Sequence, residues 1–275
     1  MLDAGRDMAL ETGAALTIEH LLLEEVIQRA RVPRSSVYRL WPHREDYVDE
    51  LLCYLAGPGS WFSDRSVLDP ETFTMVKQVL DENEVLMATA EGRLAILREV
   101  VRITAQRNYE SLTSSAPWRL HMALVATLGS TRTGEARKQI AAALEEAQRV
   151  TRESMVAVLG YIMERLGMRL RDPAYTLGHV QMAGGLLIMA LAMRNVQVQT
   201  AIGEPGGQEG ASQGSSATSS GTMAVAAHVN DLLNAPVPGP GLDGQPASWS
   251  LVGLAYLGQI EVFIEPDPEF VPPPS

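Results

Sequence analysis

The hydrophobic positions of this chain recur at helical spacing along most of its length. Between Leu21 and Ala30 apolar residues return every three or four positions, so they share one face of a short helix. The same spacing runs from Gly134 to Leu166, with charged residues on the opposite face. The segment Ser248–Ile264 alternates like a strand only at its end, and we interpret it as a helix. The pattern therefore predicts an all-α fold.

Turn and cap residues divide the remaining pattern into further helices. Prolines, glycines and polar runs mark their boundaries, and the expected helices cover residues 2–11, 34–41, 43–55, 69–90, 92–112, 116–128, 174–200 and 223–233. The chain length and these boundaries indicate a small domain over residues 1–56 and a larger helical bundle over residues 57–275. Residues 203–222 are rich in Gly and Ser and are expected to form a flexible insert.

Charge is unevenly distributed along the chain. The protein carries a formal net charge of −11, but residues 201–275 hold eight acidic residues and no Lys or Arg. From Gln28 through Arg44, by contrast, there are five arginines and no acidic residue. A nucleic acid responds to the field near the surface it meets, so an acidic protein can still present a basic binding site.

The cationic stretch has the form of two short helices that meet at a corner. Pro33 suits the first turn of the second helix, and Pro42 ends that helix because it disfavours a helical conformation at Trp41. Within this helix, Val37, Leu40 and Trp41 are expected to point inward. The outer face then carries side chains that can reach base edges when a helix lies in the major groove, namely Arg34, Ser35, Ser36 and Arg39.

The sequence from Ile27 to Tyr47, I-Q-R-A-R-V-P-R-S-S-V-Y-R-L-W-P-H-R-E-D-Y, resembles the DNA-binding domain of the TetR family of bacterial transcriptional regulators. The family pattern is A-x-x-A-G-V-S-x-x-x-[LV]-Y-x-[HY]-F-x-x-K-[ED]-x-L, and the resemblance covers about the first 56 residues. It implies a three-helix domain with a helix-turn-helix, in which Tyr38 and Arg44 hold backbone phosphates. The chain departs from the pattern at four positions, Arg31, Pro33, Arg44 and Tyr47, where the family has Gly, Ser, Lys and Leu. The last three changes keep the physical role, whereas Arg31 leaves the geometry of the corner open.

The same resemblance implies how the second domain works. It implies a homodimer whose interface uses the helix over residues 174–200 and the segment 248–264, packed as four helices with the partner. It also implies a pocket for a largely apolar small-molecule effector. Side chains that suit such a pocket are Met87, Tyr109, Trp118, His121, Met122, Met155 and Met182. The alternative for each of them is an ordinary core residue.

Other function classes find little support in the residues. The five histidines form no H-x-x-x-H or Cys/His metal pattern, and the chain has no P-loop, G-x-S-x-G or G-x-G-x-x-G motif. We therefore expect no enzyme activity, no metal and no cofactor. The single Cys53 fits a reducing compartment, the N-terminus lacks a signal-peptide core, and the apolar run Met182–Met193 is too short to cross a bilayer. A cytoplasmic protein without a membrane partner is expected.

The sequence leads to one functional hypothesis and one alternative. The hypothesis is a ligand-responsive transcriptional regulator, a repressor, that binds a palindromic double-stranded DNA operator as a homodimer. Effector binding would change the spacing between the two recognition helices, so that they no longer fit two half-sites. The alternative is a binding or interaction module that has this fold and recognises no specific operator, motivated by the acidic composition and by Arg31.

Overall fold

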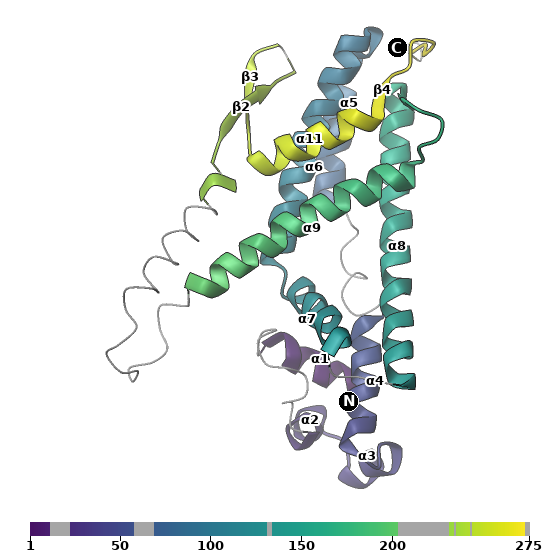
Figure 1. The fold of residues 1–275 in the computed structure, drawn as a ribbon, viewed down its shortest axis with the longest axis vertical. Helices are drawn as coiled ribbons and strands as arrows, with labels where there is room; N and C mark the ends of the chain where they lie inside the picture. Colours follow the sequence, from purple (N-terminus) through teal and green to yellow (C-terminus); the bar gives the residue numbers. More distant parts are fainter. Residues whose placement is uncertain are drawn as a thin grey trace, which may run out of the picture. The chain divides into compact units, whose positions relative to one another are not determined.

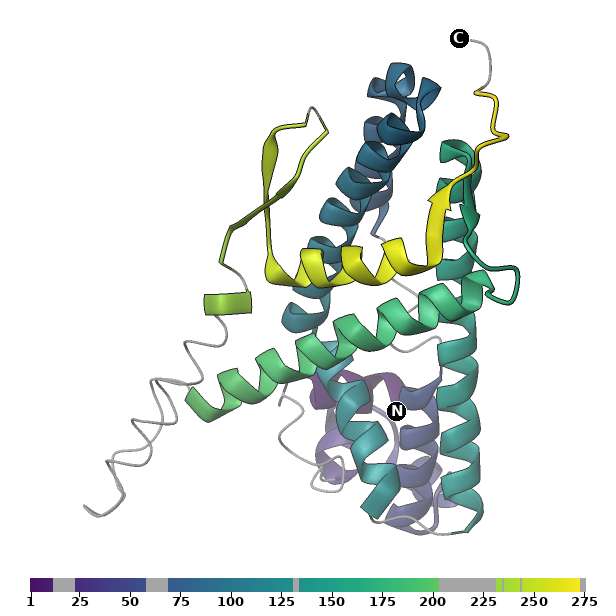
Figure 2. The same cartoon turned by 45° about the horizontal axis from the view of Figure 1, so that its top comes forward.

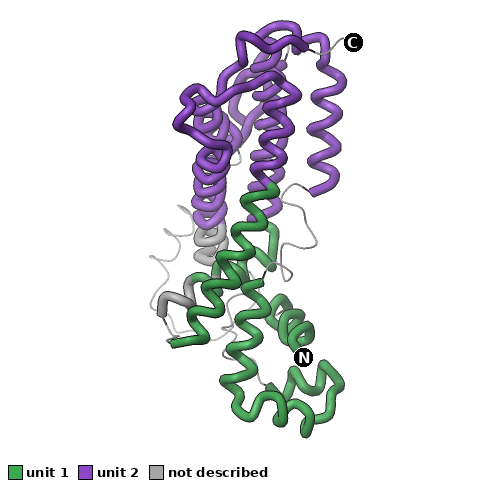
Figure 3. Tube along the Cα trace, turned by 90° about the vertical axis from the view of Figure 1, so that its right-hand side faces the viewer, with its two compact units in different colours: residues 1–67, 114–154 green, residues 68–113, 155–275 purple. Residues whose placement is uncertain are grey.

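The structure, a computed structural model, describes residues 1–11, 23–57, 69–130, 134–202, 231–233, 235–242 and 244–272. Most of these residues lie in helices, which confirms the all-α character expected from the hydrophobic pattern. The chain forms two compact units (Figure 3): unit 1 comprises Met1–Val67 and Ser114–Ser154, and unit 2 comprises Leu68–Thr113 and Met155–Ser275. The insert expected at 203–222 and most of the helix expected at 223–233 lie outside the described residues.

Unit 1 contains the N-terminal helices (Figure 1). They are α1 (Leu2–Glu11), α2 (Leu23–Ala30), α3 (Arg34–Leu40) and α4 (Arg44–Ala56). Their bounds lie close to those expected from capping residues and prolines. The same unit also includes α7 (Ala116–Ser130) and residues 135–154 of the long helix α8 (Glu135–Leu166).

The hydrophobic core of unit 1 draws on both parts of its sequence. Val26, Val37 and Leu51 from α2, α3 and α4 lie in one buried cluster with Leu120 of α7 and Ile140 of α8. Helix α7 contacts both α1 and α4. The compact unit therefore does not end at residue 56, because a helix from much later in the chain completes the core of the first four helices.

Unit 2 holds most of α6 (Ala90–Ser114) and the remainder of α8, together with α5 (Pro70–Glu82), the 3₁₀ helix η2 (Glu84–Ala88), α9 (Leu177–Ile202) and α11 (Leu251–Phe263). The single helix expected over residues 69–90 is interrupted at Asn83. The side-chain Nδ2 of Asn83 donates a 2.8 Å hydrogen bond to the carbonyl of Val79, which satisfies one of the last acceptors of α5. The chain then continues in the tighter turns of η2.

Two small antiparallel sheets, which the sequence pattern does not predict, complete unit 2. β1 (Met168–Leu170) pairs with β4 (Ile264–Pro266), and β2 (Val237–Pro240) pairs with β3 (Pro246–Trp249). Between the two C-terminal strands, Ser250 caps the N-terminus of α11 by accepting a 3.1 Å hydrogen bond from the Gly253 N–H. The segment 248–264 is thus helical over residues 251–263, which include most of its strand-like end, and only Ile264 belongs to β4.

Helices α9 and α11 pack against each other within unit 2 (Figures 1 and 2). The ring of Tyr256 lies over Gly184, so that a methyl group on Gly184 would be 2.5 Å from Cε2 of the tyrosine. Beside this contact, Nε2 of Gln259 donates a 3.2 Å hydrogen bond to the carbonyl of Val180. Gly184 therefore allows the close helix approach that the small residues of this apolar segment suggest.

Among the described residues, one segment is long and apolar enough to cross a membrane by those two criteria. It is Leu177–Asn195 of α9, with 19 residues and a mean hydropathy of 1.3. The segment extends beyond the twelve-residue run seen in the sequence and takes in polar residues such as His179 and Gln181. Only 22% of the segment is buried. Large apolar side chains are exposed on both packed helices: Met182, Leu186 and Met193 on α9, and Leu251 and Val262 on α11.

Candidate functional site

The corner between α2 and α3 is formed by three residues. Arg31 adopts φ = 52°, the left-handed conformation that glycine adopts most easily, and its N–H donates a 3.2 Å hydrogen bond to the carbonyl of Gln28. Pro33, two residues later, is extended (φ −64°, ψ 128°) and occupies the N-cap position of α3, just before the first turn in which it was expected. The chain thus makes its sharp turn with arginine at the position where a glycine would be unstrained.

The two faces of α3 differ in burial. Val37 and Trp41 lie in the core, whereas the residues expected to contact DNA, Arg34, Ser35, Ser36, Tyr38 and Arg39, are all exposed. Leu40 is also exposed, at 64%, and the expectation that it points inward is wrong. In a helix, Leu40 stands about 60° to one side of Val37 and Trp41 about 40° to the other, and the core lies on the side of Trp41.

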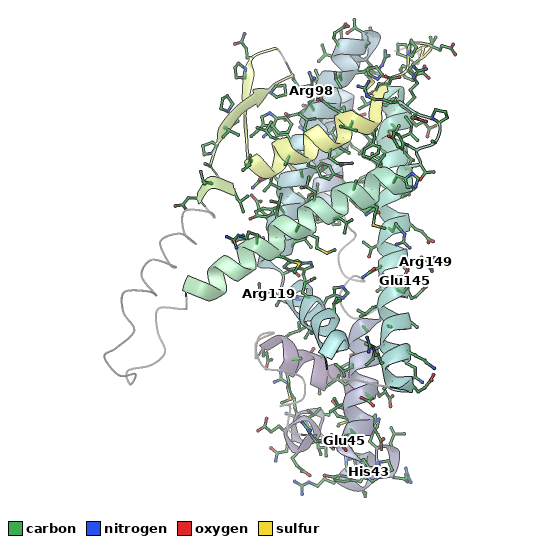
Figure 4. All side chains as sticks on the ribbon, viewed as in Figure 1. His43, Glu45, Arg98, Arg119, Glu145 and Arg149 are labelled. Atoms are coloured by element: carbon green, nitrogen blue, oxygen red, sulfur yellow. The ribbon has the colours of Figure 1, made fainter. Side chains whose placement is uncertain are left out.

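The junction between α3 and α4 is held by side-chain hydrogen bonds. Nε1 of Trp41 donates a 2.6 Å bond to Glu50, and the indole meets the ring of Tyr47 edge-on at 5.2 Å between centroids. The N–H of His43 donates to Oδ2 of Asp46 at 3.1 Å. Figure 4 shows His43 at the start of α4, close to α3. Arg44, the first residue of α4, is exposed beside this junction.

An acidic residue of α2 engages two of the expected DNA contacts. Oε2 of Glu24 lies 2.5 Å from Nη2 of Arg34, and Oε1 accepts a 2.8 Å hydrogen bond from the hydroxyl of Tyr38. This hydrogen bond raises the pKa of Tyr38. No local spacing rule connects Glu24 with α3, because the contacts cross the corner, and sequence reasoning therefore missed them.

A second candidate site is a small cavity inside unit 2. Its volume is about 60 Å³, enough for a few water molecules. Four helices of the unit line it. Eight apolar residues and three polar ones contribute: Leu97, Val100, Val101 and Thr104 of α6, Met155, Val158, Leu159 and Ile162 of α8, Gln181 of α9, and Tyr256 and Ile260 of α11.

The three polar residues of the cavity differ in their hydrogen bonds. The hydroxyl of Thr104 donates a 2.8 Å hydrogen bond to the carbonyl of Val100. Within the described part of the chain, no hydrogen bond engages the Gln181 amide or the Tyr256 hydroxyl. Burial raises the pKa of Tyr256 to about 12, so its phenol is neutral and protonated at physiological pH. No Asp, Glu, Lys, Arg or His lines the cavity, and an apolar cavity of this kind disfavours a charged ligand.

Of the seven residues proposed for an effector pocket, only Met155 lines this cavity. Met87, Tyr109, Trp118 and His121 are buried, Met122 is half-buried and Met182 is exposed. Trp118, His121 and Met122 belong to unit 1 and the other four to unit 2. Burial lowers the pKa of His121 to about 4, which makes it a neutral histidine at pH 7.

The polar residues Gln181 and Tyr256, by contrast, were not among the pocket residues predicted from the sequence. The signal that was present is that each is one of few hydrogen-bonding side chains within an apolar helical stretch. Across the described ranges, no group of three or more His, Cys, Asp or Glu side chains could hold a metal ion.

Comparison with models of protein families, with curated proteins and with solved structures finds no match to this chain.

Proposed function

We propose that this protein is a ligand-responsive transcriptional regulator, a repressor, that reads a palindromic DNA operator with α3. The observation that carries the proposal is the two-sided character of α3 behind its sharp corner. Val37 and Trp41 anchor one side in the core, while the other side presents contiguous polar and basic side chains to solvent. A helix exposed in this manner, next to a corner and with no acidic residue of its own, suits the major groove.

The residue types on this surface divide into two roles. Arg34 and Arg39 can each donate two hydrogen bonds to a guanine, and Ser35 and Ser36 are short enough to let the helix approach the base edges. Tyr38 and Arg44 are proposed to hold phosphates, which fix the register of the helix and supply much of the affinity. The hydrogen bond from Trp41 to Glu50 joins the end of α3, which carries Tyr38, to α4, which carries Arg44.

A homodimer is the second part of the proposal. One seven-residue helix covers only a few base pairs, so two copies related by a two-fold axis are needed for a specific site. The exposed apolar side chains of α9 and α11 support such a pairing, because Met182, Leu186 and Val262 would leave water in the interface. The same burial would account for an apolar helix that the single chain leaves mostly uncovered.

Ligand response is the third part. The cavity chemistry favours an uncharged, largely hydrocarbon ligand with one group that hydrogen-bonds to Tyr256 or Gln181. Helix α8 is continuous and carries both Met155 and Ile162 at the cavity and Ile140 in the core of unit 1. A ligand that binds one position of this helix more tightly than another would change DNA affinity. The change can be no larger than the ratio of the ligand's affinities for the two positions.

The experiment that tests DNA binding is a salt titration. Labelled duplexes are titrated with the wild-type protein and with Tyr38→Ala at several salt concentrations. Phosphate contacts predict an affinity that falls steeply with salt, and Tyr38→Ala should weaken binding to every duplex by a similar factor. Binding that is absent or independent of salt would favour the alternative, an interaction module without operator recognition.

A further inference from the structure

One carboxylate, that of Glu24, engages two of the side chains with which α3 would contact DNA. It lies 2.5 Å from the guanidinium of Arg34 and accepts a 2.8 Å hydrogen bond from Tyr38. Arg34 and Tyr38 are four residues apart and so lie on one face of α3. Glu24 comes from α2, on the other side of the corner. All three side chains are partly exposed, with 43% of Glu24, 64% of Arg34 and 45% of Tyr38 accessible.

The hydrogen-bond capacity of the two partners differs. A tyrosine hydroxyl has a single donor, and that of Tyr38 is directed to Glu24. For Tyr38 to donate to a DNA phosphate, this bond must break. An arginine has five donors, so Arg34 keeps several after it pairs with Glu24. The carboxylate thus withholds the phosphate contact proposed for Tyr38 entirely and the base contact proposed for Arg34 in part.

A carboxylate in this position also resembles a phosphate in its chemistry. It is an anion that forms an ion pair with a guanidinium and accepts a hydrogen bond from a phenol, as a phosphodiester would. DNA that approaches α3 must therefore displace Glu24 from these donors, and a phosphate close to them meets a negative charge. Both effects lower affinity for any duplex, since neither depends on base sequence.

We propose that Glu24 is an internal competitor for the DNA backbone, which limits binding of α3 to duplexes of unrelated sequence. This inference rests on the proposed function and adds a specificity residue to it. An operator that offers base contacts to Ser35, Ser36 and Arg39 offsets the loss of the Glu24 contacts. A duplex that offers only phosphates does not.

The neighbouring residue Glu25 provides a matched control. It lies next to Glu24 on α2, is exposed, and forms no ion pair in the described part of the chain. Glu24→Gln and Glu25→Gln each remove one negative charge from the same turn, but only Glu24→Gln weakens the contacts with Arg34 and Tyr38. A glutamine also retains an oxygen that can accept from Tyr38, so the change preserves the packing of the corner.

The test measures the affinity of the full-length wild type, Glu24→Gln and Glu25→Gln for a random-sequence duplex over a range of salt concentrations. Circular dichroism and thermal unfolding establish that all three proteins are folded. We expect Glu24→Gln to bind roughly threefold to tenfold more tightly than wild type, because Tyr38 is held less strongly away from the phosphates and the negative charge that repels them is removed. The slope of log affinity against log salt should steepen by about one. Glu25→Gln should change affinity by less than about twofold.

The possible results separate this inference from the proposed function. Wild-type binding with no gain in Glu24→Gln, or with a loss, would overturn the competitor role and assign Glu24 to the positioning of Arg34. Equal gains in Glu24→Gln and Glu25→Gln would also overturn it, because the effect would then be one of net charge. Absence of binding by all three proteins, Glu24→Gln included, would overturn this inference alone, because the proposed function is tested by binding to an operator and not to a random-sequence duplex.

Discussion

The ring of Tyr256 lies directly over Gly184, so that a methyl group on the glycine would be 2.5 Å from Cε2 of the tyrosine. This contact joins α9 to α11 and forms one wall of the cavity in unit 2. Only a residue without a side chain fits there. The position of the Tyr256 hydroxyl in the cavity therefore depends on one glycine in the neighbouring helix.

Gly184→Ala should accordingly destabilise the protein. The added methyl group must displace the tyrosine ring, and overpacking of this kind costs about 1–3 kcal/mol. Gly178→Ala on the same helix is the control, because the nearest atom to an added methyl is 3.5 Å away and ordinary helix propensity should make the change neutral or slightly stabilising. Urea unfolding at one protein concentration measures both. Equal stability of the two variants would contradict the close contact.

Arg31→Gly should stabilise the protein. Arg31 adopts φ = 52°, a conformation that costs a non-glycine residue free energy, and glycine would relieve about 1 kcal/mol of that cost. Arg31→Lys keeps the charge and the backbone strain, and it should leave the free energy of unfolding within about 0.5 kcal/mol of wild type. If Arg31→Gly is no more stable than Arg31→Lys, the corner does not hold the left-handed conformation.

The ends of the helices show how much of the fold can be predicted from sequence. Local signals act over a few residues, so the proline at position 70 and the cap at Asp69 correctly mark the start of α5. The pairing of β1 with β4 joins residues almost a hundred positions apart, for example Arg169 with Glu265. Neither three-residue strand has a periodicity of its own that would reveal it. The same reason explains why Leu120 of α7 was not expected in the core of the first helices.

The candidate site likewise has some features that could be predicted from the sequence and others that could not. The outer residues of α3 follow from helical spacing, and all of them are exposed as expected. The exposure of Leu40 depends on which side of a short helix faces the core, and spacing alone could not decide between two adjacent positions. The contacts of Glu24 depend on the angle at the corner, and that angle depends on the φ of Arg31.

Acid should destabilise the protein through His121. Burial lowers the pKa of its imidazole to about 4, while in the unfolded chain the pKa is near 6.5. Between these values the unfolded state binds a proton that the folded state does not, so stability is fully present above about pH 6.5 and falls as the pH is lowered. The slope attributable to one proton is about 1.4 kcal/mol per pH unit.

The measurement compares urea unfolding of wild type and His121→Gln between pH 7 and pH 4. Groups other than His121 contribute equally to both proteins, so they cancel in the difference. We expect the difference in unfolding free energy to shrink steadily as the pH falls. Parallel curves would show that His121 is not buried in its neutral form.

Leu186→Glu should convert a dimer into a monomer. The leucine side chain is 57% exposed on α9, and a carboxylate at this position would lose its hydration in the proposed interface. Val85→Glu is the control, since Val85 is 89% exposed on η2 and lies outside the proposed interface. Light scattering at micromolar concentration should report a dimer for wild type and Val85→Glu. A wild-type monomer would contradict the two-fold arrangement.

The measurement that tests the central claim most directly is selection of bound duplexes from a random DNA pool, carried out with wild type and with Arg39→Ala. If α3 reads bases, wild type should enrich a palindrome with two half-sites, and Arg39→Ala should enrich the same spacing with relaxed preference at particular base pairs. Enrichment of no sequence by wild type, or an identical sequence preference in both proteins, would contradict the assignment of Arg39 and α3 to base recognition.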